Sequence, residues 1–157
     1  VTGGYVNSAL AKTESQLNGF DEAIMLTQDG HVCEGSGENI FIVTGGALVT
    51  PPSSDNILVG ITRASVMQFA RDELGIPTIE RSIDRSELYI ADEIFFMGTA
   101  WELLPVVATD GLKVGDGLMG PVARALDRQY ENLVRGESVD RHGWLLSVLL
   151  PALAKQG

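Results

Sequence analysis

The apolar residues at the start of the chain repeat at helical spacing. Val6, Leu10 and Leu17 fall on one side of a helix over Val6–Leu17, and the following Asn18-Gly19 pair is typical of a helix end. Short apolar runs separated by turn residues come next, which is the pattern of antiparallel hairpins. The strands predicted in this part of the chain are Glu22–Thr27, His31–Glu34, Asn39–Thr44 and Ala47–Thr50.

The apolar pattern becomes helical again from Thr62. The apolar residues of this segment share one face, and its charged residues lie elsewhere on the helix. Gly75 stands where a glycine C-cap is expected. The apolar face consists of Val66, Phe69, Ala70 and Leu74, and the charged residues are Arg63, Arg71 and Asp72.

Strands and helices follow one another irregularly in the rest of the chain. Gly120-Pro121 is a typical helix start, and the helix after it ends near Gly136. Because this order is not a regular βαβ array, the sequence predicts a mixed α+β domain. The elements predicted here are strands at Thr78–Ile83, Glu93–Thr99 and Leu103–Thr109, a short helical piece at Arg85–Ala91, and a last helix with Val122, Leu126, Tyr130 and Leu133 on one face.

The composition excludes several classes of protein. The chain has 157 residues, 45% of them hydrophobic, which suits one ordinary domain with a packed core. A formal net charge of −10 and the lack of Lys or Arg blocks argue against binding to nucleic acid. The single cysteine cannot form an internal disulfide, so a reducing compartment, the cytoplasm, is expected. No apolar stretch approaches the roughly 20 residues that a membrane-spanning helix needs, and no Cys/His cluster has the spacing of metal ligands.

The segment Glu34-Gly35-Ser36-Gly37-Glu38-Asn39 is the most unusual in the chain. It lies between two predicted strands, its glycines permit a tight backbone path, and its two carboxylates could project into a site. The alternative is a glycine-rich loop whose acids face water, because the segment is not a generic phosphate-binding motif.

Two further segments lie at the ends of predicted elements. Gly60-Ile61-Thr62-Arg63 precedes a helix, where free backbone N–H groups and a threonine hydroxyl could bind a phosphate; alternatively, Thr62 is only a helix cap. Gly98-Thr99-Ala100-Trp101-Glu102 follows a strand and either presents backbone amides to a ligand or forms an ordinary turn.

The two histidines and the cysteine are not expected to have catalytic or metal-binding roles. His31 and His142 are expected to be surface residues, because neither has a partner that would support a metal site or a catalytic triad. Cys33 is expected to be a small, half-buried filler rather than a nucleophile.

Taken together, the motifs of this chain resemble the branched-chain aminotransferases, which are class IV aminotransferases that use pyridoxal 5′-phosphate and have fold type IV. The resemblance runs in order from Val1 to about Leu145. It implies an α+β fold with a mixed sheet or pseudo-barrel and flanking helices over residues 1–145, followed by a tail at 146–157. The segments that carry it are GGYVNS, EGSGENIF, GITR, ERSIDRSELYIADEIFFMGTAWE and GDGLMGPVARAL.

The resemblance implies which residues surround the cofactor ring. Glu34 is implied as the carboxylate that pairs with the pyridine nitrogen and keeps the ring protonated. Tyr5 is implied as the hydroxyl that bonds the phenolic oxygen, and Leu58 as the residue that packs against the ring face. Glu38 and Asn39 are implied to support the loop.

The resemblance also implies a phosphate cradle and a substrate turn. Ile61 and Thr62 would bind the phosphate, with a further contact from Thr99, and the turn that begins at Gly98 would receive the substrate carboxylate. The implied cofactor-binding residues are Tyr5, Glu34, Glu38, Asn39, Leu58, Gly60, Ile61, Thr62 and Thr99, and the implied substrate-binding residues are Gly98, Thr99, Ala100 and Trp101.

The implied reaction is transamination of leucine, isoleucine or valine with 2-oxoglutarate, in which a lysine base moves the α-proton. In the family pattern this lysine would lie immediately before Val1, and Lys12, Lys113 and Lys155 do not fit the role. Because the chain also begins without Met or a signal peptide, we expect it to be the C-terminal part of a protein about twice as long, without its N-terminal lobe. A homodimer or larger homo-oligomer is implied as well.

One residue departs from the family pattern and leaves the substrate open. Trp101 stands where branched-chain enzymes usually have a second alanine, so it can narrow or redirect the pocket. Within the superfamily, the alternatives are a D-amino-acid aminotransferase and an aminodeoxychorismate lyase. A non-catalytic homologue, or an isolated lobe that serves only in assembly, is the alternative from a different class.

Overall fold

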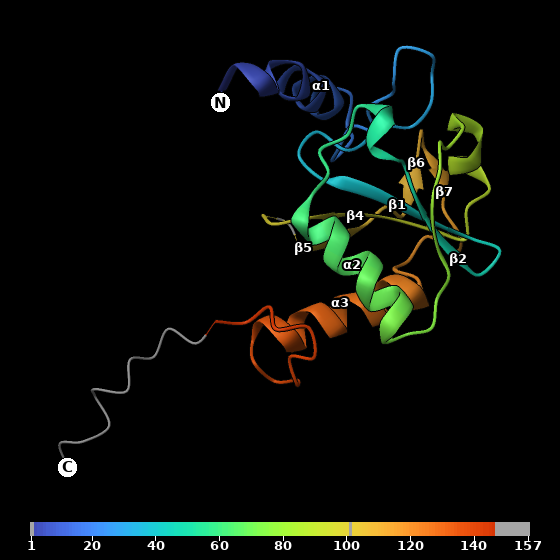
Figure 1. Cartoon of the computed structure of the whole chain (residues 1–157). Coiled ribbons are helices and arrows are strands. Elements are labelled where there is room, and N and C mark those ends of the chain that lie inside the picture. Colours follow the sequence, from blue (N-terminus) through green and yellow to red (C-terminus); the bar gives the residue numbers. More distant parts are fainter. Residues whose placement is uncertain (1, 101, 147–157) are drawn as a thin grey trace.

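The computed structural model describes residues 2–100 and 102–146 and contains one five-stranded sheet in the order β3-β2-β1-β4-β5 (Figure 1). β2 and β3 are parallel and the other neighbours are antiparallel, so the sheet is mixed. The strands are β1 (Asn39–Thr44), β2 (Ala47–Thr50), β3 (Thr78–Glu80), β4 (Glu93–Gly98) and β5 (Glu102–Pro105), with a separate hairpin of β6 (Ala108–Thr109) and β7 (Leu112–Lys113). The helices are η1 (Thr2–Tyr5), α1 (Val6–Leu17), η2 (Ser53–Asp55), α2 (Ile61–Asp72), η3 (Arg85–Tyr89) and α3 (Pro121–Val134).

The two central strands, β1 and β4, are buried on both faces. Their sequences, NIFIVT and EIFFMG, are almost continuously apolar because side chains alternate between two cores. Phe41 and Phe95 are register partners on one face, and their rings stack with centroids 5.2 Å apart. Ile40 and Phe96 are register partners on the other face. The sheet therefore has a layer of structure on each side.

Helices α2 and α3 lie side by side and cover the Phe41 face (Figure 1). Val66, Phe69 and Ala70 of α2 are buried there, together with Ala123, Leu126 and Leu133 of α3. These include most of the apolar positions predicted from the helical spacing. The prediction of an α+β fold with a mixed sheet and flanking helices is confirmed.

The start of α3 is capped by a residue from the sheet. The carboxylate of Glu93, the first residue of β4, accepts hydrogen bonds from the backbone N–H groups of Val122 and Ala123 at 2.9 Å. Gly120 is needed directly before the helix, because a Cβ there would lie 2.1 Å from Glu93 Cδ. This contact joins the helix layer to the sheet.

Two predicted strands are each divided between different partners. The predicted strand Thr78–Ile83 pairs with β2 only as far as Glu80, after which Ile83 accepts a hydrogen bond from the backbone N–H of Val32. The predicted strand Leu103–Thr109 also ends early, at Pro105, and its last two residues form β6 of the small hairpin. Both predictions were too long, because an apolar run does not reveal where the pairing partner changes.

The predicted hairpin of Glu22–Thr27 and His31–Glu34 is present in reduced form. The backbone of Met25 exchanges two hydrogen bonds with Cys33 and Glu34, and Leu26 and Val32 form an isolated bridge. The chain returns antiparallel as expected, but neither segment forms an extended strand.

Helix α1 has the predicted bounds but packs differently from α2 and α3. No residue of α1 is buried, and Leu10 on its apolar face is 66% exposed. The helix is held by Lys12, whose Nζ donates to Glu22 Oε2 and to the Asp21 carbonyl, each at 2.6 Å. Its contact with the rest of the fold is therefore partly polar.

The C-terminal segment contradicts one expectation about a histidine. His142 is not a surface residue, because its side chain is only 10% exposed and stacks on Trp144 with centroids 4.5 Å apart. It also hydrogen-bonds Gln68 of α2 at 3.0 Å. This segment packs against α2, whereas the predicted tail lies outside the described residues from 147 onward.

Candidate cofactor-binding site

Two segments that are far apart in the sequence meet at the start of β1. The backbone N–H of Leu58 donates to Glu34 Oε2 at 2.9 Å. The side-chain amide of Asn39 donates to the same carboxylate at 3.2 Å and to the Leu58 carbonyl at 2.7 Å. These bonds fasten the EGSGEN loop to the segment that leads into α2.

The two carboxylates of the loop are withdrawn from water. Glu38 is only 5% exposed, which contradicts the alternative that both acids face water, and Glu34 is half-buried. Burial raises the pKa of Glu34, opposed by the hydrogen bond from Leu58, and the charge of Glu38 adds to the rise. Burial also raises the pKa of Glu38, with the nearby charge of Glu22 acting in the same direction. A cation placed beside Glu34 would relieve the cost of its buried charge.

The first glycine of the loop, Gly35, is required by close contacts. A Cβ on Gly35 would lie 2.8 Å from Glu38 Oε2 and 2.9 Å from Phe96 Cε1. Gly37, in contrast, has open space around it and donates its N–H to Glu38 Oε2 at 3.2 Å. The loop therefore folds over its own second carboxylate.

Glu34, Glu38, Asn39 and Leu58 are called the EGSGEN cluster below. Helix α2 begins beside this cluster. Gly60, directly before the helix, has a φ of 69°, which side chains other than glycine rarely adopt. A Cβ on this residue would also lie 2.1 Å from Asn39 Oδ1, so only glycine fits there. The first helical bond runs from Ala64 N to the Gly60 carbonyl at 3.1 Å, which leaves the N–H groups of Ile61 and Thr62 ahead of it. Such groups, with the helix dipole, favour an anion.

The end of β4 reaches the same place. The hydroxyl of Thr62 lies 3.4 Å from that of Thr99, which immediately follows β4. Thr99 and Ala100 are exposed, and Trp101 lies outside the described residues. Gly98 rests on Glu38, since a Cβ there would lie 3.4 Å from Glu38 Cγ. The structure thus brings the EGSGEN, GIT and GTA segments together.

Tyr5 has no hydrogen bond to this cluster among the described residues. It is the last residue of η1 and is 54% exposed, and among residues 2–100 and 102–146 no hydrogen bond connects its hydroxyl to the other candidates. Leu58 and Ile61 are also exposed, at 63% and 89%. The cluster therefore has an open apolar side.

A family model for class IV aminotransferases matches residues 1–109. The chain belongs to the class IV aminotransferases. It is 51% identical over 148 residues to a probable branched-chain-amino-acid aminotransferase from Aquifex aeolicus, and 43% identical over 143 residues to the branched-chain-amino-acid aminotransferase of Escherichia coli K12. These alignments cover 94% and 91% of this chain but 48% and 46% of those proteins. The chain spans about half the length of the curated relatives it matches.

Solved structures of branched-chain amino acid aminotransferases share the fold of this chain over about half of their own length. A crystal structure of the E. coli branched-chain amino acid aminotransferase superposes with a TM-score of 0.90 at 42% identity, over 94% of this chain and 48% of that one. The enzyme from Thermobaculum terrenum in its PLP form gives a TM-score of 0.84 at 40% identity, over 87% of this chain and 44% of that one. The predicted resemblance to branched-chain aminotransferases is confirmed.

Sequence reasoning misplaces one residue next to this site. The helical spacing predicts that Arg63 lies away from the buried face of its helix, but only 4% of it is exposed. The usable signal was its position three residues before Val66, a core residue on the same side of the helix.

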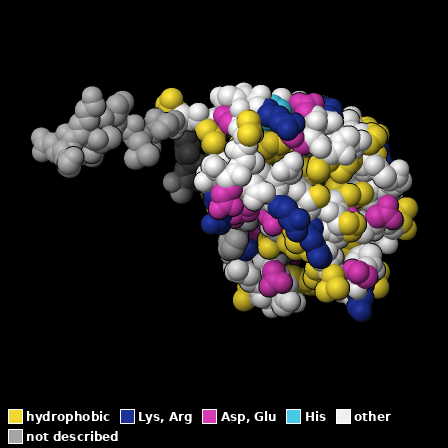
Figure 2. Space-filling model, turned by 90° about the horizontal axis from the view of Figure 1, so that it is seen from below, with side chains coloured by type: hydrophobic (Ala, Val, Ile, Leu, Met, Phe, Trp, Pro, Cys, Tyr) yellow, Lys and Arg dark blue, Asp and Glu magenta, His cyan; other side chains and the backbone are white. Residues whose placement is uncertain are grey.

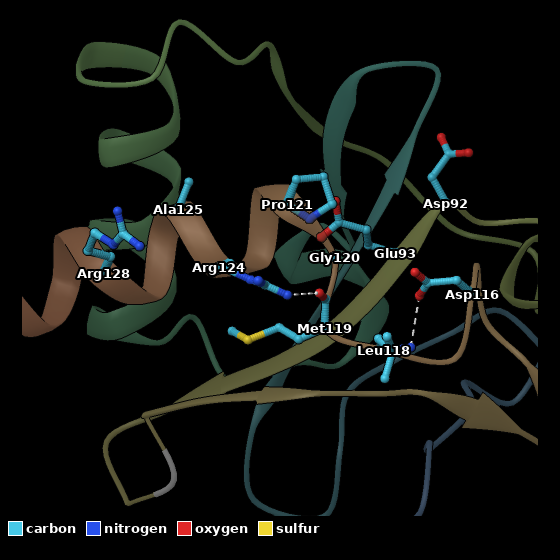
Figure 3. Close-up of a pocket in the computed structure, with 10 residues that line it drawn as sticks. All are labelled: Asp92, Glu93, Asp116, Leu118, Met119, Gly120, Pro121, Arg124, Ala125 and Arg128. Carbon is cyan, nitrogen blue, oxygen red and sulfur yellow. Dashed lines mark hydrogen bonds between the residues drawn. The ribbon is translucent and has the colours of Figure 1, made fainter.

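A separate cavity of about 680 Å³ lies at the start of α3 and contains none of the candidate residues (Figure 3). Three of the charged side chains that line it already have partners in the fold. Glu93 caps α3, Arg124 donates to the Met119 carbonyl at 2.9 Å, and Asp116 accepts from the N–H of Leu118 at 2.9 Å. These three side chains therefore serve the local structure at the start of α3.

Charged side chains of both signs are mixed on one face of the molecule (Figure 2). Lys and Arg side chains on the face shown in Figure 2 are interspersed with Asp and Glu rather than gathered in one patch. None of the described helices is both long and apolar enough to cross a membrane.

Proposed function

We propose that this chain forms the cofactor-binding half of an enzyme that transaminates leucine, isoleucine and valine with 2-oxoglutarate by means of pyridoxal 5′-phosphate. The observation that carries the proposal is the junction of Glu34, Leu58 and Asn39 beside the Thr62–Thr99 pair. It provides a buried carboxylate and an anion-binding helix start in one place. The identity to branched-chain aminotransferases supports the choice of substrate.

The donors and acceptors present fit pyridoxal 5′-phosphate. The N–H groups of Ile61 and Thr62 and the hydroxyls of Thr62 and Thr99 would hold the phosphate, and Gly60 lets the backbone approach closely. Glu34 would accept a hydrogen bond from the protonated ring nitrogen, while Asn39 and Glu38 keep the loop in place. Leu58 would pack against the ring face, and Tyr5 would bond the phenolic oxygen.

When bound, the cofactor supplies an electron-accepting ring that stabilises negative charge on the substrate's α-carbon. Glu34 would contribute by keeping a positive charge on the ring nitrogen. Because the Glu34 carboxylate is held in a fixed position, this electrostatic effect needs no rearrangement during the reaction. The turn of Gly98, Thr99 and Ala100 would orient the substrate carboxylate through its backbone amides. Trp101 would border the substrate's side chain and so affect which amino acid is preferred.

Activity assays on the protein expressed from its complete gene test this proposal. The protein should bind pyridoxal phosphate with a visible absorbance that borohydride abolishes, and should convert leucine with 2-oxoglutarate. Activity on D-amino acids alone, or release of pyruvate from aminodeoxychorismate, would select one of the other two reactions of the superfamily. Absence of both cofactor binding and turnover would select the non-catalytic alternative.

The assembly and location of the enzyme are part of the same proposal. A homodimer or larger homo-oligomer is supported by the likeness to branched-chain aminotransferases, and light scattering would measure it. A cytoplasmic location is supported by the single cysteine, Cys33, which cannot form an internal disulfide. Burial raises the pKa of this thiol to about 11, which favours an unreactive cysteine.

A further inference from the structure

We infer that Arg63 is a positioning residue for the phosphate cradle, fixing the first turn of α2 to the ends of β2 and β3. The inference rests on the proposed function, since it concerns the same cradle. It assigns a task to a buried cation that does not touch the cofactor-binding groups themselves.

The side chain of Arg63 spans three structural elements. Its Nε donates to the hydroxyl of Thr50 at 3.3 Å, and its Nη2 donates to the Pro51 carbonyl at 2.9 Å and to Glu80 Oε2 at 2.7 Å. Thr50 and Glu80 are register partners at the ends of the parallel strands β2 and β3. One guanidinium therefore joins the start of α2 to both strands.

The same contacts extend to the EGSGEN cluster. The hydroxyl of Thr50 donates to the carbonyl of Ile40 at 2.8 Å, and Ile40 follows Asn39 in β1. Asn39 in turn holds the Leu58 carbonyl. The irregular segment from Pro51 to Gly60 is thus tied near its beginning by Arg63 and near its end by Asn39.

Burial makes these bonds a firm constraint. Arg63 is 4% exposed, whereas Glu80 is 48% exposed at the rim. A buried guanidinium is stable only with its donors satisfied, so rotation of the first helical turn would leave a charge without partners. Arg63 is also the third residue of α2, directly after Thr62, so moving its backbone moves the cradle.

A lysine in place of Arg63 cannot make the same set of hydrogen bonds. The planar guanidinium directs separate N–H groups at Thr50, Pro51 and Glu80, whereas an ammonium group is a single point charge on a flexible stem. A lysine can keep the ion pair with Glu80 but not all three contacts.

The test compares pyridoxal phosphate with pyridoxal, which lacks the phosphate, on the apoprotein expressed from its complete gene. Arg63→Met should weaken the affinity for pyridoxal phosphate about 10-fold to 100-fold, the effect of losing about one hydrogen bond to a charged group, and change the affinity for pyridoxal much less. Calorimetric titration with inorganic phosphate alone should show the same loss. Arg71→Met, an exposed position on the same helix, is the matched control and should behave as wild type.

Arg63→Lys and Glu80→Gln keep the test informative if Arg63→Met does not fold. Each should retain the fold and lose part of the preference for the phosphorylated form. Equal weakening of both ligands, or an unchanged preference in these variants, would overturn the positioning role while leaving the proposed function intact. If the wild-type protein itself shows no preference for pyridoxal phosphate, the proposed function fails instead.

Discussion

Glu34 illustrates how a single residue acquires a chemical task from its surroundings. Its carboxylate is half-buried and receives hydrogen bonds from Leu58 and Asn39 on the same oxygen, Oε2. The anchored oxygen fixes the orientation of the carboxylate, and burial raises its pKa by disfavouring the charge. A site of this kind is prepared for a cationic partner rather than for water.

Replacing Glu34 with glutamine should therefore remove catalysis while keeping the fold. Glutamine can still accept the hydrogen bonds of Leu58 and Asn39, but it carries no charge to keep the ring nitrogen protonated. We expect kcat/KM to fall by about 100-fold to 1,000-fold, the usual effect of losing one electrostatic stabiliser. Steady-state kinetics with leucine, alongside circular dichroism, measures this. Glu14→Gln on the exposed side of α1 is the control, and a variant with wild-type kcat/KM would remove Glu34 from the mechanism.

For Glu38, in contrast, we predict that removing the charge stabilises the protein. Because its pKa is raised in the fold, its charge costs stability above that pKa, and the cost disappears as the pH falls and the carboxyl becomes protonated. Glu38→Gln should raise the melting temperature at pH 7 and have little effect near pH 4. Thermal melts at both pH values, with Glu137→Gln as an exposed control, measure the difference. A lower melting temperature at pH 7 would mean that the charge stabilises the loop.

At the scale of elements, the site depends on how helices are joined to the sheet. Helix α2 begins beside Asn39 of β1, Thr50 of β2 and Thr99, which follows β4. Helix α3 begins at Glu93 of β4. Each helix start is thus fixed by a side chain of another element. Rigid helix starts are what a cradle built from backbone N–H groups requires.

The cap of α3 gives a measurable consequence. Glu93→Ala would leave the N–H groups of Val122 and Ala123 without their acceptors inside the fold, at a cost of about 1 to 3 kcal/mol. Urea unfolding followed by circular dichroism measures the loss. Asp92→Ala, at the neighbouring exposed position, should change stability little. Equal effects of the two substitutions would contradict a specific cap.

At the scale of the whole molecule, negative charge is distributed widely. The formal net charge of −10 arises from 21 acidic and 11 basic residues, and several ion pairs, such as Arg81–Glu87 and Arg85–Asp110, lie at the surface. Exposed pairs contribute little to stability, whereas uniform self-repulsion opposes the compact state. Screening should therefore favour folding.

Salt should consequently stabilise this protein. Raising the NaCl concentration from about 0.01 M to 0.15 M shortens the Debye length from about 30 Å to 8 Å and weakens the repulsion among the excess acids. We expect the melting temperature to rise over this range in differential scanning fluorimetry. A fall would show that the surface ion pairs outweigh the net charge.

The sequence by itself determined the elements whose patterns are local. Helix α1, strands β1 and β2 and most of α2, β4 and α3 follow from apolar spacing, glycine turns and helix-start residues, and the order of the motifs indicated the family. Local pattern also singled out the EGSGEN, GITR and GTA segments, because their residue types suit turns and helix starts.

Only the tertiary structure decided how these segments meet. The division of Thr78–Ile83 between two partners, the bond of the Arg63 guanidinium to Glu80 and the packing of His142 all depend on residues distant in the chain. The hydrogen bonds that join Glu34 to Leu58 and Thr62 to Thr99 span 24 and 37 residues. Periodicity reports which side of an element is apolar, whereas the partner of a buried polar group is set by strand order and helix placement, which no local pattern contains.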